Sequence, residues 1–494
     1  MKTRRNSFKR SVVLGLIMVF VGVLIFFGAQ WITKTGVFKI PGVLTYDESL
    51  TDEEKDALGR IFTNEVVLDK DLSIMGEYRF DKPSSADEII YNIYVPVADY
   101  YSTEDNLEIS QAENYFADAA SSPVDYKMIP LEELDFKKKL LKINGSYYLD
   151  DFNRGAIYRV IKFSSEKFDE EVLALIQGKI GMTGLSEKEV LTFAQTGVTA
   201  LSRGMNQKLQ QVGSAEYFAE KIGGFLSKFD ITHTSNESSF TEMASANNIC
   251  SDPRFISTLE GIGLDIVELT GNHTVDCGAA AARNTIDLYN QKGIAIVGGG
   301  KNAEEGAKPL EINEKGSGIT FLAYNLSTGG ATLGEAPGAN QYSEEDAVSN
   351  INAAKERGDF VIVDVQYYEC SAYASEYEDP TCDYANSSAG DQVGFFRHLI
   401  EIGADMVVGT SAHQPQTFEL YEDGVIYYGL GNLFFDQIWW PGTTRSLVLA
   451  HYFHDGKLLQ TKVIPTVYDS SMQTDLMDSD TAKRYLERLI KARP

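Results

Sequence analysis

Short apolar segments alternate with helical segments from about residue 190 onward, and this rhythm constrains the fold more than any other feature. The segments typical of strands are residues 191–197, 231–234, 266–269, 295–297, 320–324, 360–365, 406–408 and 425–428. Helical segments lie among them at residues 215–228, 254–261, 280–291 and 392–402. This pattern predicts an α/β fold, in which functional side chains usually follow the carboxyl ends of strands.

The chain of 494 residues is too long for one hydrophobic core, so we expect two folded domains after any targeting segment. We assign residues 46–188 to a smaller mixed α/β domain, with helical stretches at 51–62 and 166–177 and strand-like runs at 89–97 and 139–143. It contains no chemical motif. Residues 189–470 form the second domain, and residues 471–494 end the chain with a helix over 480–491.

Basic residues stand at the N-terminus, ahead of an uncharged apolar run: Lys2, Arg4, Arg5, Lys9 and Arg10, then Val12 to Ala29. At about 1.5 Å per residue, a helix of this length nearly spans the hydrocarbon core of a bilayer. The basic flank predicts that residues 1–32 are a cytoplasmic tail and transmembrane anchor. After a linker at 33–45, the bulk of the chain would then lie outside the cell. A cleaved signal peptide is the alternative.

Charge and cysteine content restrict the partners and the compartment. The formal net charge of −27 argues against a nucleic-acid partner, because phosphate binding needs clustered Lys and Arg. Outside the membrane the four cysteines are expected to be oxidised. Cys370 and Cys382 bracket a short loop, which predicts a local disulfide, whereas Cys250 and Cys277 pair only if the fold brings them together.

Polar residues follow several of the predicted strands. Asn272-His273 follows the strand at 266–269, and such a pair can ligate a metal through its amide oxygen and donate a proton through its imidazole. A Gly-Asn turn alone is ordinary turn chemistry. Other polar motifs follow other strands: Gly197 to Arg203, Asn236-Glu237, Val365-Gln366, Ser411 to Gln416, and Gly431-Asn432 to Asp436.

In their order along the chain, these motifs resemble those of the CapA family of capsule or poly-γ-glutamate biosynthesis proteins. The resemblance extends from residue 191 to residue 467. It is most specific from Gly403-Ala404-Asp405 through His413-Gln414-Pro415-Gln416 to Gly431-Asn432-Leu433-Phe434-Phe435-Asp436. It implies a four-layer α/β/β/α metallophosphatase-like sandwich with a metal site between the sheets. The smaller mixed α/β domain and the N-terminal transmembrane helix would precede this sandwich.

The resemblance also implies roles for single residues. It assigns catalysis to His273, Asn272 and Arg203, and a metal to Glu237, Asn272 and His413. It assigns a polymer-binding cleft to Asn236, Gln366, Gln416 and Asn432.

Three departures from the family pattern weaken the expected metal site. Val198 stands where the family has Asp, and Gln366 or Tyr367 where it commonly has His. Ser411 replaces the first His of a His-x-His motif. A two-metal site needs several anionic and imidazole ligands. We therefore expect at most one weakly held divalent ion, Mn²⁺ or Zn²⁺, with a metal-free cleft as the alternative.

Three functions remain open. The first is a membrane-anchored extracytoplasmic protein that assists the biosynthesis, export or anchoring of an anionic surface polymer, capsule or poly-γ-glutamate. The second is a metal-dependent hydrolase, a phosphoesterase or amide hydrolase, of envelope material. The third is a non-catalytic polymer-binding scaffold. The expected partners are the polymer or its synthesis machinery, and the membrane. Asn272-His273 favours the hydrolase, whereas Val198 and Ser411 oppose it.

Overall fold

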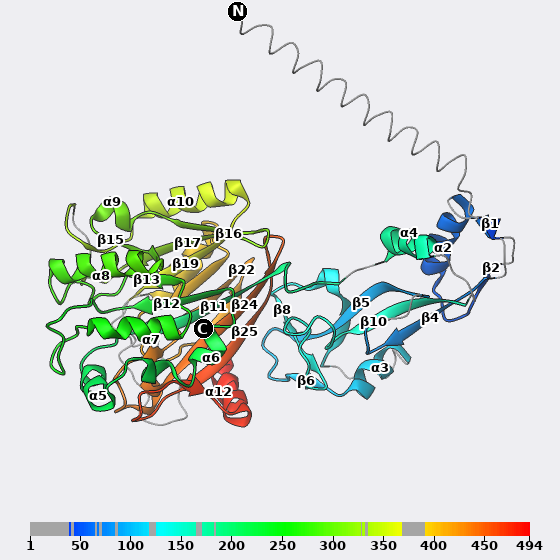
Figure 1. Cartoon of the computed structure of the whole chain (residues 1–494). Helices are drawn as coiled ribbons and strands as arrows, with labels where there is room; N and C mark the ends of the chain where they lie inside the picture. Colours follow the sequence, from blue (N-terminus) through cyan, green and yellow to red (C-terminus); the bar gives the residue numbers. More distant parts are fainter. Residues whose placement is uncertain are drawn as a thin grey trace, which may run out of the picture. The chain divides into compact units, whose positions relative to one another are not determined.

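The computed structural model describes residues 39–40, 44–64, 67–68, 72–83, 87–117, 125–164, 170–181, 184–327, 329–330, 334–367 and 391–494. These residues form two compact units (Figure 1). The smaller unit contains the described residues up to Pro96, with 106–132 and 142–184, and the larger unit contains 97–105, 133–141 and 185–494.

Two predictions fall on residues that the structure does not describe. The anchor predicted over residues 1–32 lies outside the described residues, and so do Cys370 and Cys382. Within the described ranges, no helix has both the length and the apolar character that a bilayer crossing requires.

The smaller unit is built on one mixed sheet in the order β2-β4-β10-β5-β7. Its strands are β2 (Leu44–Tyr46), β4 (Leu72–Arg79), β10 (Ile157–Ser164), β5 (Glu88–Asp99) and β7 (Lys127–Pro130). Helices α2 (Asp52–Asn64) and α4 (Glu170–Ile180) bury one face, and α3 (Ile109–Ala117) shares a second apolar cluster with β7 and β10. The short strands β1 (Lys39–Ile40) and β3 (Val67–Leu68) pair, as do β6 (Asn106–Leu107) and β9 (Lys142–Ile143).

A buried ion pair ties α2 to this sheet. Thr51 and Glu54 form a capping box at the start of α2, because Glu54 N donates to Thr51 Oγ1 and Thr51 N donates to Glu54 Oε2. The same Glu54 carboxylate accepts hydrogen bonds from Arg159 Nε and Nη2 on β10, each 2.7 Å long. The cap and the ion pair together fix the start of α2 against the sheet.

The larger unit contains two sheets. In the first, β14 (Ala295–Val297), β13 (Ile266–Glu268), β12 (Ile231–Asn236) and β11 (Val190–Thr199) run parallel. The antiparallel strands β24 (Arg445–His454), β25 (Lys457–Val467) and β26 (Asp475–Leu476) continue it, and β23 (Asn432–Phe434) pairs with the end of β11.

The second sheet has the order β16-β17-β19-β20-β22-β21. Its strands are β16 (Leu310–Glu314), β17 (Ser317–Asn325), β19 (Phe360–Gln366), β20 (Met406–Gly409), β22 (Gly424–Tyr427) and β21 (Phe418–Tyr421). Strands β17, β19, β20 and β22 are parallel, so their carboxyl ends lie at one edge. The two-stranded pair β15 (Gly299–Gly300) and β18 (Gly338–Ala339) lies apart from both sheets.

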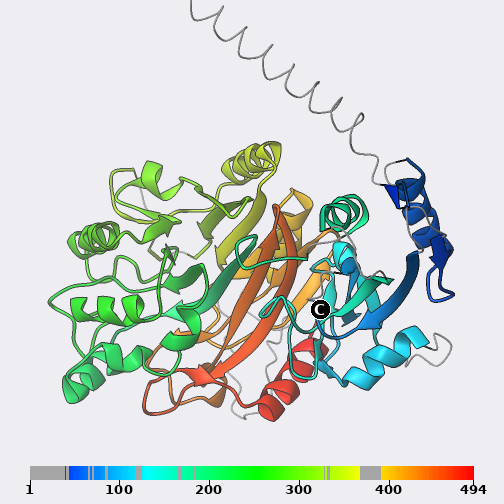
Figure 2. The same cartoon turned by 45° about the vertical axis from the view of Figure 1, so that its right-hand side comes forward.

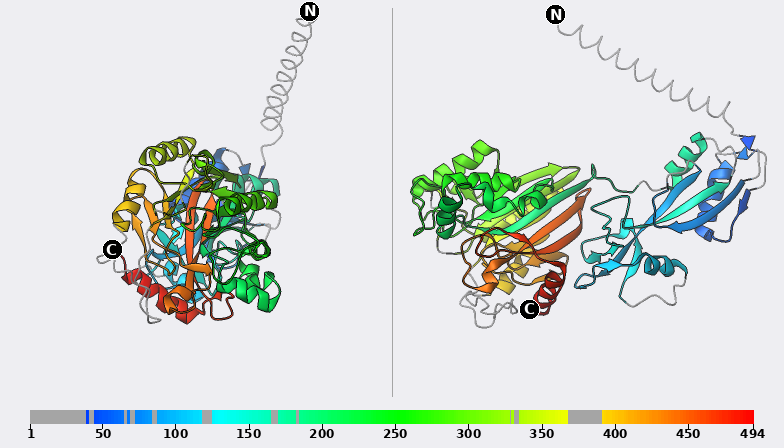
Figure 3. Two further views of the ribbon diagram at one scale, coloured as in Figure 1. Left: turned by 90° about the vertical axis from the view of Figure 1, so that its left-hand side faces the viewer. Right: turned by 60° about the horizontal axis from the view of Figure 1, so that its bottom comes forward.

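Four layers follow from the way the apolar side chains are buried. One core lies between the sheets and contains Phe193 and Ile266 from the first and Phe321 and Ile362 from the second. The outer face of the first sheet is covered by α5 (Gly204–Val212), α6 (Gly223–Leu226), α7 (Ile256–Gly261) and α8 (Ala279–Lys292). Helices α10 (Glu344–Arg357) and α11 (Gln392–Glu401) cover the second sheet. Figures 2 and 3 show this α/β/β/α stack from other sides.

Two segments from the first half of the sequence belong to the larger unit. Residues 97–105 follow β5, and residues 133–141 contain β8 (Lys138–Leu140), whose Leu140 pairs with Val97. Gln460 of β25 accepts a hydrogen bond from Leu140 N and donates one to Lys138 O. Near them α12 (Ser479–Lys491) ends the chain and buries Tyr485 and Leu489 in the core between the sheets. The sequence analysis placed both segments inside the 46–188 domain.

Close approach of two backbones brings β23 to the end of β11. Val198 N donates to Gly431 O over 2.8 Å, and a Cβ atom at Gly197 would lie 2.0 Å from that same oxygen. Only glycine therefore fits at position 197, and this contact places Asn432 beside Val198 in the ladder.

We expect Gly197→Ala to lower the free energy of unfolding of the larger unit by about 1–3 kcal/mol, because the new methyl group forces β11 and β23 apart. Urea denaturation followed by tryptophan emission measures it, since Trp439 and Trp440 lie in this unit. Gly224→Ala is the matched control: a Cβ atom there meets no heavy atom within 4 Å. Equal stability of both variants would contradict the argument.

Candidate functional site

Polar side chains face the space between the sheets near the carboxyl ends of three strands. Along each strand, alternate residues point to this space, which is apolar at Ile231, Ile266 and Ile362. It becomes polar further along the same faces, at His233 and Ser235 on β12, Glu268 and Thr270 on and after β13, and Asp364 and Gln366 on β19. All six polar side chains are buried. The site therefore forms where the inter-sheet core opens.

A group of three neutral side chains lies at this edge. Gln366 Nε2 donates to Asn272 Oδ1 over 3.3 Å and to Ser411 Oγ over 3.2 Å. Gln366 is 1% exposed, and its Oε1 atom accepts no hydrogen bond within the described part of the chain. The structure thus brings Asn272, predicted to be catalytic, next to Gln366, predicted to bind the polymer, and adds Ser411 to them.

Glu237, His413 and Asn432 form a second group beside the first. His413 Nδ1 lies 2.8 Å from Asn432 Oδ1, so the amide oxygen fixes the orientation of the ring. The other ring nitrogen, Nε2, lies 3.9 Å from Glu237 Oε2. Glu237 also adjoins the Asn272 turn, because a Cβ atom at Gly271 would lie 2.6 Å from Glu237 Cα.

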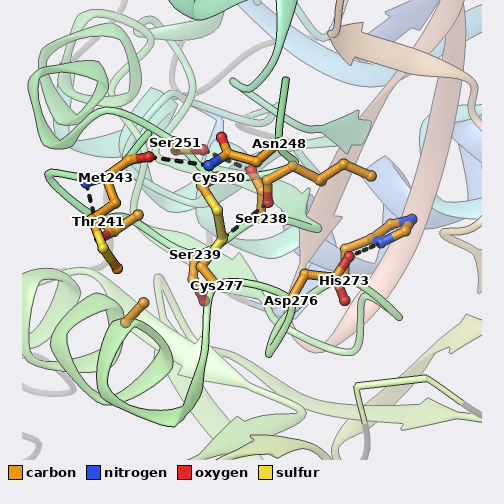
Figure 4. The surroundings of a disulfide bond; sticks show 12 residues. Ser238, Ser239, Thr241, Met243, Asn248, Cys250, Ser251, His273, Asp276 and Cys277 are labelled. Carbon is orange, nitrogen blue, oxygen red and sulfur yellow. Dashed lines mark hydrogen bonds and ion pairs between the residues drawn. A yellow bond between two sulfur atoms is a disulfide. The ribbon is translucent and has the colours of Figure 1, made fainter. Parts of the chain in front are cut away.

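His273 is paired with the carboxylate of Asp276, which lies three residues later in the same loop. Its Nδ1 atom lies 2.7 Å from Asp276 Oδ2, and its side chain is partly exposed (Figure 4). This pairing orients the ring and leaves Nε2 as the atom able to take or give a proton. The spacing of His273 and Asp276 was visible in the sequence, but the sequence analysis gave Asp276 no role.

A disulfide joins the loops that carry Glu237 and His273. Cys250, from the loop after β12, is bonded to Cys277, from the loop after β13 (Figure 4). The Ser239 hydroxyl, which donates to Thr274 O, joins the same two loops. From the sequence, these two cysteines could pair only if the fold brought them together, and the structure does so.

The structure ties Arg203 to the end of β23. Arg203 Nη2 lies 2.5 Å from Asp436 Oδ1, and its guanidinium stacks 4.5 Å from the centroid of the Phe435 ring. Gly204 N donates to the other oxygen of Asp436. Arg203, predicted to be catalytic, here holds two chain segments together. Its partner is 233 positions away, so no local sequence signal could reveal it.

Asn236 and Gln416, both predicted to line the cleft, lie elsewhere. Asn236 ends β12, and its side chain points to the face opposite that of the next residue, Glu237. On that face its Nδ2 atom donates to Tyr289 Oη on α8. Gln416 Oε1 accepts a hydrogen bond from Gln392 at the start of α11. The motifs placed both residues in the right region. Their side chains, however, point to other partners, so neither residue lines the cleft as predicted.

The donors at this site do not fit a tightly held metal ion. Among the described residues no group of three or more His, Cys, Asp or Glu side chains could hold a metal. At 3.9 Å, Glu237 Oε2 and His413 Nε2 could share an ion only at a ligand–metal–ligand angle of about 125–155°, wider than the tetrahedral angle, because each metal–ligand bond is about 2.0–2.2 Å. Asn272 adds a neutral oxygen that is already an acceptor for Gln366.

A buried ionisable cluster lies below the site, between the sheets. His233 Nε2 lies 3.0 Å from Asp364 Oδ2, and Gln195 Nε2 donates to Asp364 Oδ1 over 2.6 Å. Glu268 on β13 accepts hydrogen bonds from the backbone and hydroxyl of Thr270. Burial, together with the nearby Asp364 charge, raises the pKa of Glu268 to about 7. The sequence analysis set His233 aside and did not single out Glu268 or Asp364.

We expect that replacing both Cys250 and Cys277 by Ser lowers the free energy of unfolding by about 2–4 kcal/mol, because the link constrains the unfolded chain. A thermal melt of the variant beside the wild type measures it. As a control, dithiothreitol is added to both proteins. Reduction of the Cys250–Cys277 bond should lower the melting temperature of the wild type, whereas the variant has no such bond to reduce. Equal melting temperatures for the wild type and the double variant would contradict the expectation.

We expect Glu268→Gln to stabilise the chain increasingly as the pH rises from about 4.5 to about 7. The folded state raises the pKa of this carboxyl, so the unfolded chain ionises first and wild-type stability falls across that window. The gain of the variant should grow by up to about 1.4 kcal/mol per pH unit and level off above pH 7. Urea denaturation at several pH values measures it; a difference independent of pH would contradict it.

Comparison with known proteins gives the chain a family context. Residues 192–437 match the family model described as bacterial capsule synthesis protein PGA_cap. The capsule biosynthesis protein CapA of Bacillus anthracis is 22% identical over 318 residues, which cover 61% of this chain and 74% of that protein. The PGA biosynthesis protein CapA of Bacillus subtilis is 26% identical over 205 residues, covering 41% of this chain and 50% of that protein.

Two further similarities are more limited. A probable polyglutamine synthesis accessory protein of Mycobacterium tuberculosis is 26% identical over 207 residues, covering 39% of this chain and 51% of that protein. The chain thus spans about half the length of the second and third of these relatives. The crystal structure of TT1561 of Thermus thermophilus superposes with a TM-score of 0.30 at 10% identity, covering 54% of this chain and 99% of that one. That TM-score is below the level at which a shared fold is inferred.

Proposed function

Because this chain belongs to the bacterial capsule synthesis protein family through residues 192–437, we propose that it takes part in making, exporting or anchoring a capsule-type surface polymer. Relatives named for capsule and PGA biosynthesis support the proposal. The observation that carries it is the edge of the inter-sheet core, where Asn272, Gln366 and Ser411 present neutral hydrogen-bonding groups. Such groups suit binding along a polymer better than rapid cleavage of one.

In this proposal the protein does not depend on a tightly held metal. An ion at Glu237 and His413 would have one carboxylate and one imidazole as its charged or strongly basic ligands. Such an ion would polarise a bound oxygen, but it would retain most of its water and leave readily. Mn²⁺ or Zn²⁺ would therefore bind weakly and leave on dialysis.

The proposal places the larger unit outside the cytoplasmic membrane, held by the apolar run from Val12 to Ala29. The basic residues ahead of that run support this orientation. The disulfide between Cys250 and Cys277 supports it independently, because such bonds persist mainly in oxidising compartments.

A second candidate, a slow hydrolase of envelope material, is favoured by one observation. Asp276 holds the His273 ring at Nδ1 and leaves Nε2 available for proton transfer. A general acid or base is oriented in this way. The Cys250–Cys277 bond braces the loop that carries this pair. If this candidate were correct, His273→Gln would abolish the biological role, whereas a binding protein would tolerate that change better than the loss of Gln366.

We expect that deleting the gene in its own bacterium removes most of the surface polymer, and that the wild-type chain restores it. Gln366→Ala and Glu237→Gln should restore little, because they disrupt the two groups at the site. Glu304→Gln is the control, since its side chain is 90% exposed on α9 (Ala303–Gly306). Staining and chemical assay of extracted surface polymer provide the measurement.

Two outcomes would count against the proposal. An unchanged amount of surface polymer in the deletion strain would remove the assigned role. Full loss of complementation by His273→Gln, together with retention by Gln366→Ala, would favour the hydrolase instead.

A further inference from the structure

Two contacts join the β13 segment to β19, one in the core between the sheets and one at the edge of the site. At the edge, Gln366 Nε2 donates to Asn272 Oδ1 over 3.3 Å. In the core, Glu268 interacts electrostatically with Asp364, and both carboxyl groups are fully buried. Asp364 precedes Gln366 by two residues and Glu268 precedes Asn272 by four. A change in the inner contact therefore acts on the same two segments that form the outer contact.

Glu268 also holds the start of the turn that carries Asn272. Its Oε1 atom accepts hydrogen bonds from the backbone N–H and the hydroxyl of Thr270. Thr270 is buried and is followed directly by Gly271 and Asn272. Gly271 is closely packed, because a Cβ atom there would lie 2.6 Å from Glu237 Cα. A displacement of the Glu268 carboxyl is thus passed to Asn272 through a short length of tightly packed backbone.

Few ionisable groups surround Glu268. His233 of β12 and Asp364 of β19 face it, and His233 Nε2 lies 3.0 Å from Asp364 Oδ2. His451 of β24 interacts with His233, and burial together with this neighbour lowers the pKa of His451 to about 3, so its ring stays neutral. The inward residues of β14 and β17 are apolar, and Glu237 lies further along, at the edge. In the core, Glu268 therefore has one imidazole and one carboxyl group as ionisable neighbours.

The protonation state of Glu268 decides whether its contact with Asp364 attracts or repels. Burial and the Asp364 charge raise the pKa of Glu268 to about 7. Hydrogen bonds from Ser235 and Thr270 lower this pKa, but their effect is the smaller one. A protonated carboxyl can donate to a carboxylate oxygen, whereas two carboxylates repel each other strongly in a low-dielectric interior. Ionisation leaves two negative charges beside at most one positive charge, on His233.

We propose that Glu268 and Asp364 form a pH-sensitive latch between the two sheets. Protonated Glu268 keeps the turn of Asn272 against Gln366, which is the arrangement that presents hydrogen-bonding groups to the polymer. Ionisation of Glu268 pushes the β13 segment and β19 apart and releases this outer contact, so the site binds less well as its surroundings become alkaline. The inference rests on the proposed function and adds regulation of the same site.

Proton linkage gives the pH range over which the latch opens. In the closed form the pKa of Glu268 is about 7, and an opening that exposes the carboxyl to water returns the pKa toward its ordinary value of 4.5. Opening therefore becomes easier by up to about tenfold per pH unit between about 4.5 and 7. Above about 7 the carboxyl is ionised in both forms, and opening becomes no easier.

Hydrogen–deuterium exchange of the full chain in detergent tests the latch. Wild type and Glu268→Gln are compared at the same pH, so that the chemical pH dependence of exchange cancels. Gln is a neutral side chain of the same size as a protonated Glu, so the variant latch stays closed. In peptides that cover residues 270–272, the ratio of wild-type to variant exchange rates should rise about tenfold or more from about pH 5 to about pH 8.

Two further variants make the test specific. Asp265→Asn is the matched control, because Asp265 lies at the other end of β13, where its Oδ2 atom accepts a hydrogen bond from Thr232 N. This variant should keep the wild-type pH dependence in the same peptides. Ser235→Ala removes a hydrogen bond that lowers the pKa of Glu268, so the pH at which exchange levels off should move upward. It provides the second readout if Glu268→Gln does not fold.

Three results would overturn the inference. The first is a ratio of exchange rates that does not change with pH, and the second is an unchanged pH range in Ser235→Ala. The third is a rise of equal size in every segment of the larger unit, because it would show a global loss of stability. The proposed function fails separately, since a strain without the gene would then keep its surface polymer whatever the exchange rates are.

Discussion

A fully buried close pair, His233 with Asp364, joins the two sheets and sets where the site can form. His233 belongs to β12 of the first sheet and Asp364 to β19 of the second, and their side chains meet at 3.0 Å with no exposure to solvent. Gln195 of β11 donates to the same carboxylate, which adds a third strand to the contact. Buried groups of this kind cost desolvation energy unless their partners are correctly placed, so they restrict how one sheet can slide over the other. Glu237 and Gln366 lie further along these same strand faces, and the pair therefore determines which side chains meet at the edge.

The rest of the site depends on how the loops beyond that edge are held. The Cys250–Cys277 bond joins the loops after β12 and β13, and the contact of Gly197 with Gly431 brings β23 to β11. The side-chain oxygen of Asn432 then orients His413, and its nitrogen donates to Gln437 and Thr443 in the loop after β23. A chain of short-range contacts thus runs from the buried core to the loop after β23.

Much of the larger unit could be predicted from the sequence, because its parallel strands are buried on both faces and appear as short apolar runs. Strands β24 and β25 were missed: Gln460, Thr461 and Lys462 interrupt the apolar run of β25, and no helix separates the two strands. The helix predicted at 215–228 is instead a 3-10 turn, η2 (Glu216–Ala219), and the short α6, because Gly223-Gly224 weakens a continuous helix. At the site, motif order placed Asn272 and Gln366 after the carboxyl ends of strands, but it did not give the direction of Asn236. Adjacent residues of a strand face opposite sides, and the sequence alone did not settle which of Asn236 and Glu237 faces inward.

The departures from the family pattern also have a common physical consequence. Gln366 and Ser411 stand where the resemblance leads one to expect imidazole ligands, and the structure shows them hydrogen-bonded to one another, with Asn272 as the second acceptor for Gln366. Val198, in the place of an expected Asp, is buried and paired with Asn432 in the strand ladder. A single loss of a ligand would leave its neighbours as unpaired charges or donors, which is destabilising in a buried setting. Here Gln366 donates to both Ser411 and Asn272, so these three side chains are held together without an ion. That arrangement supports the proposal that a polymer binds at this site through hydrogen bonds.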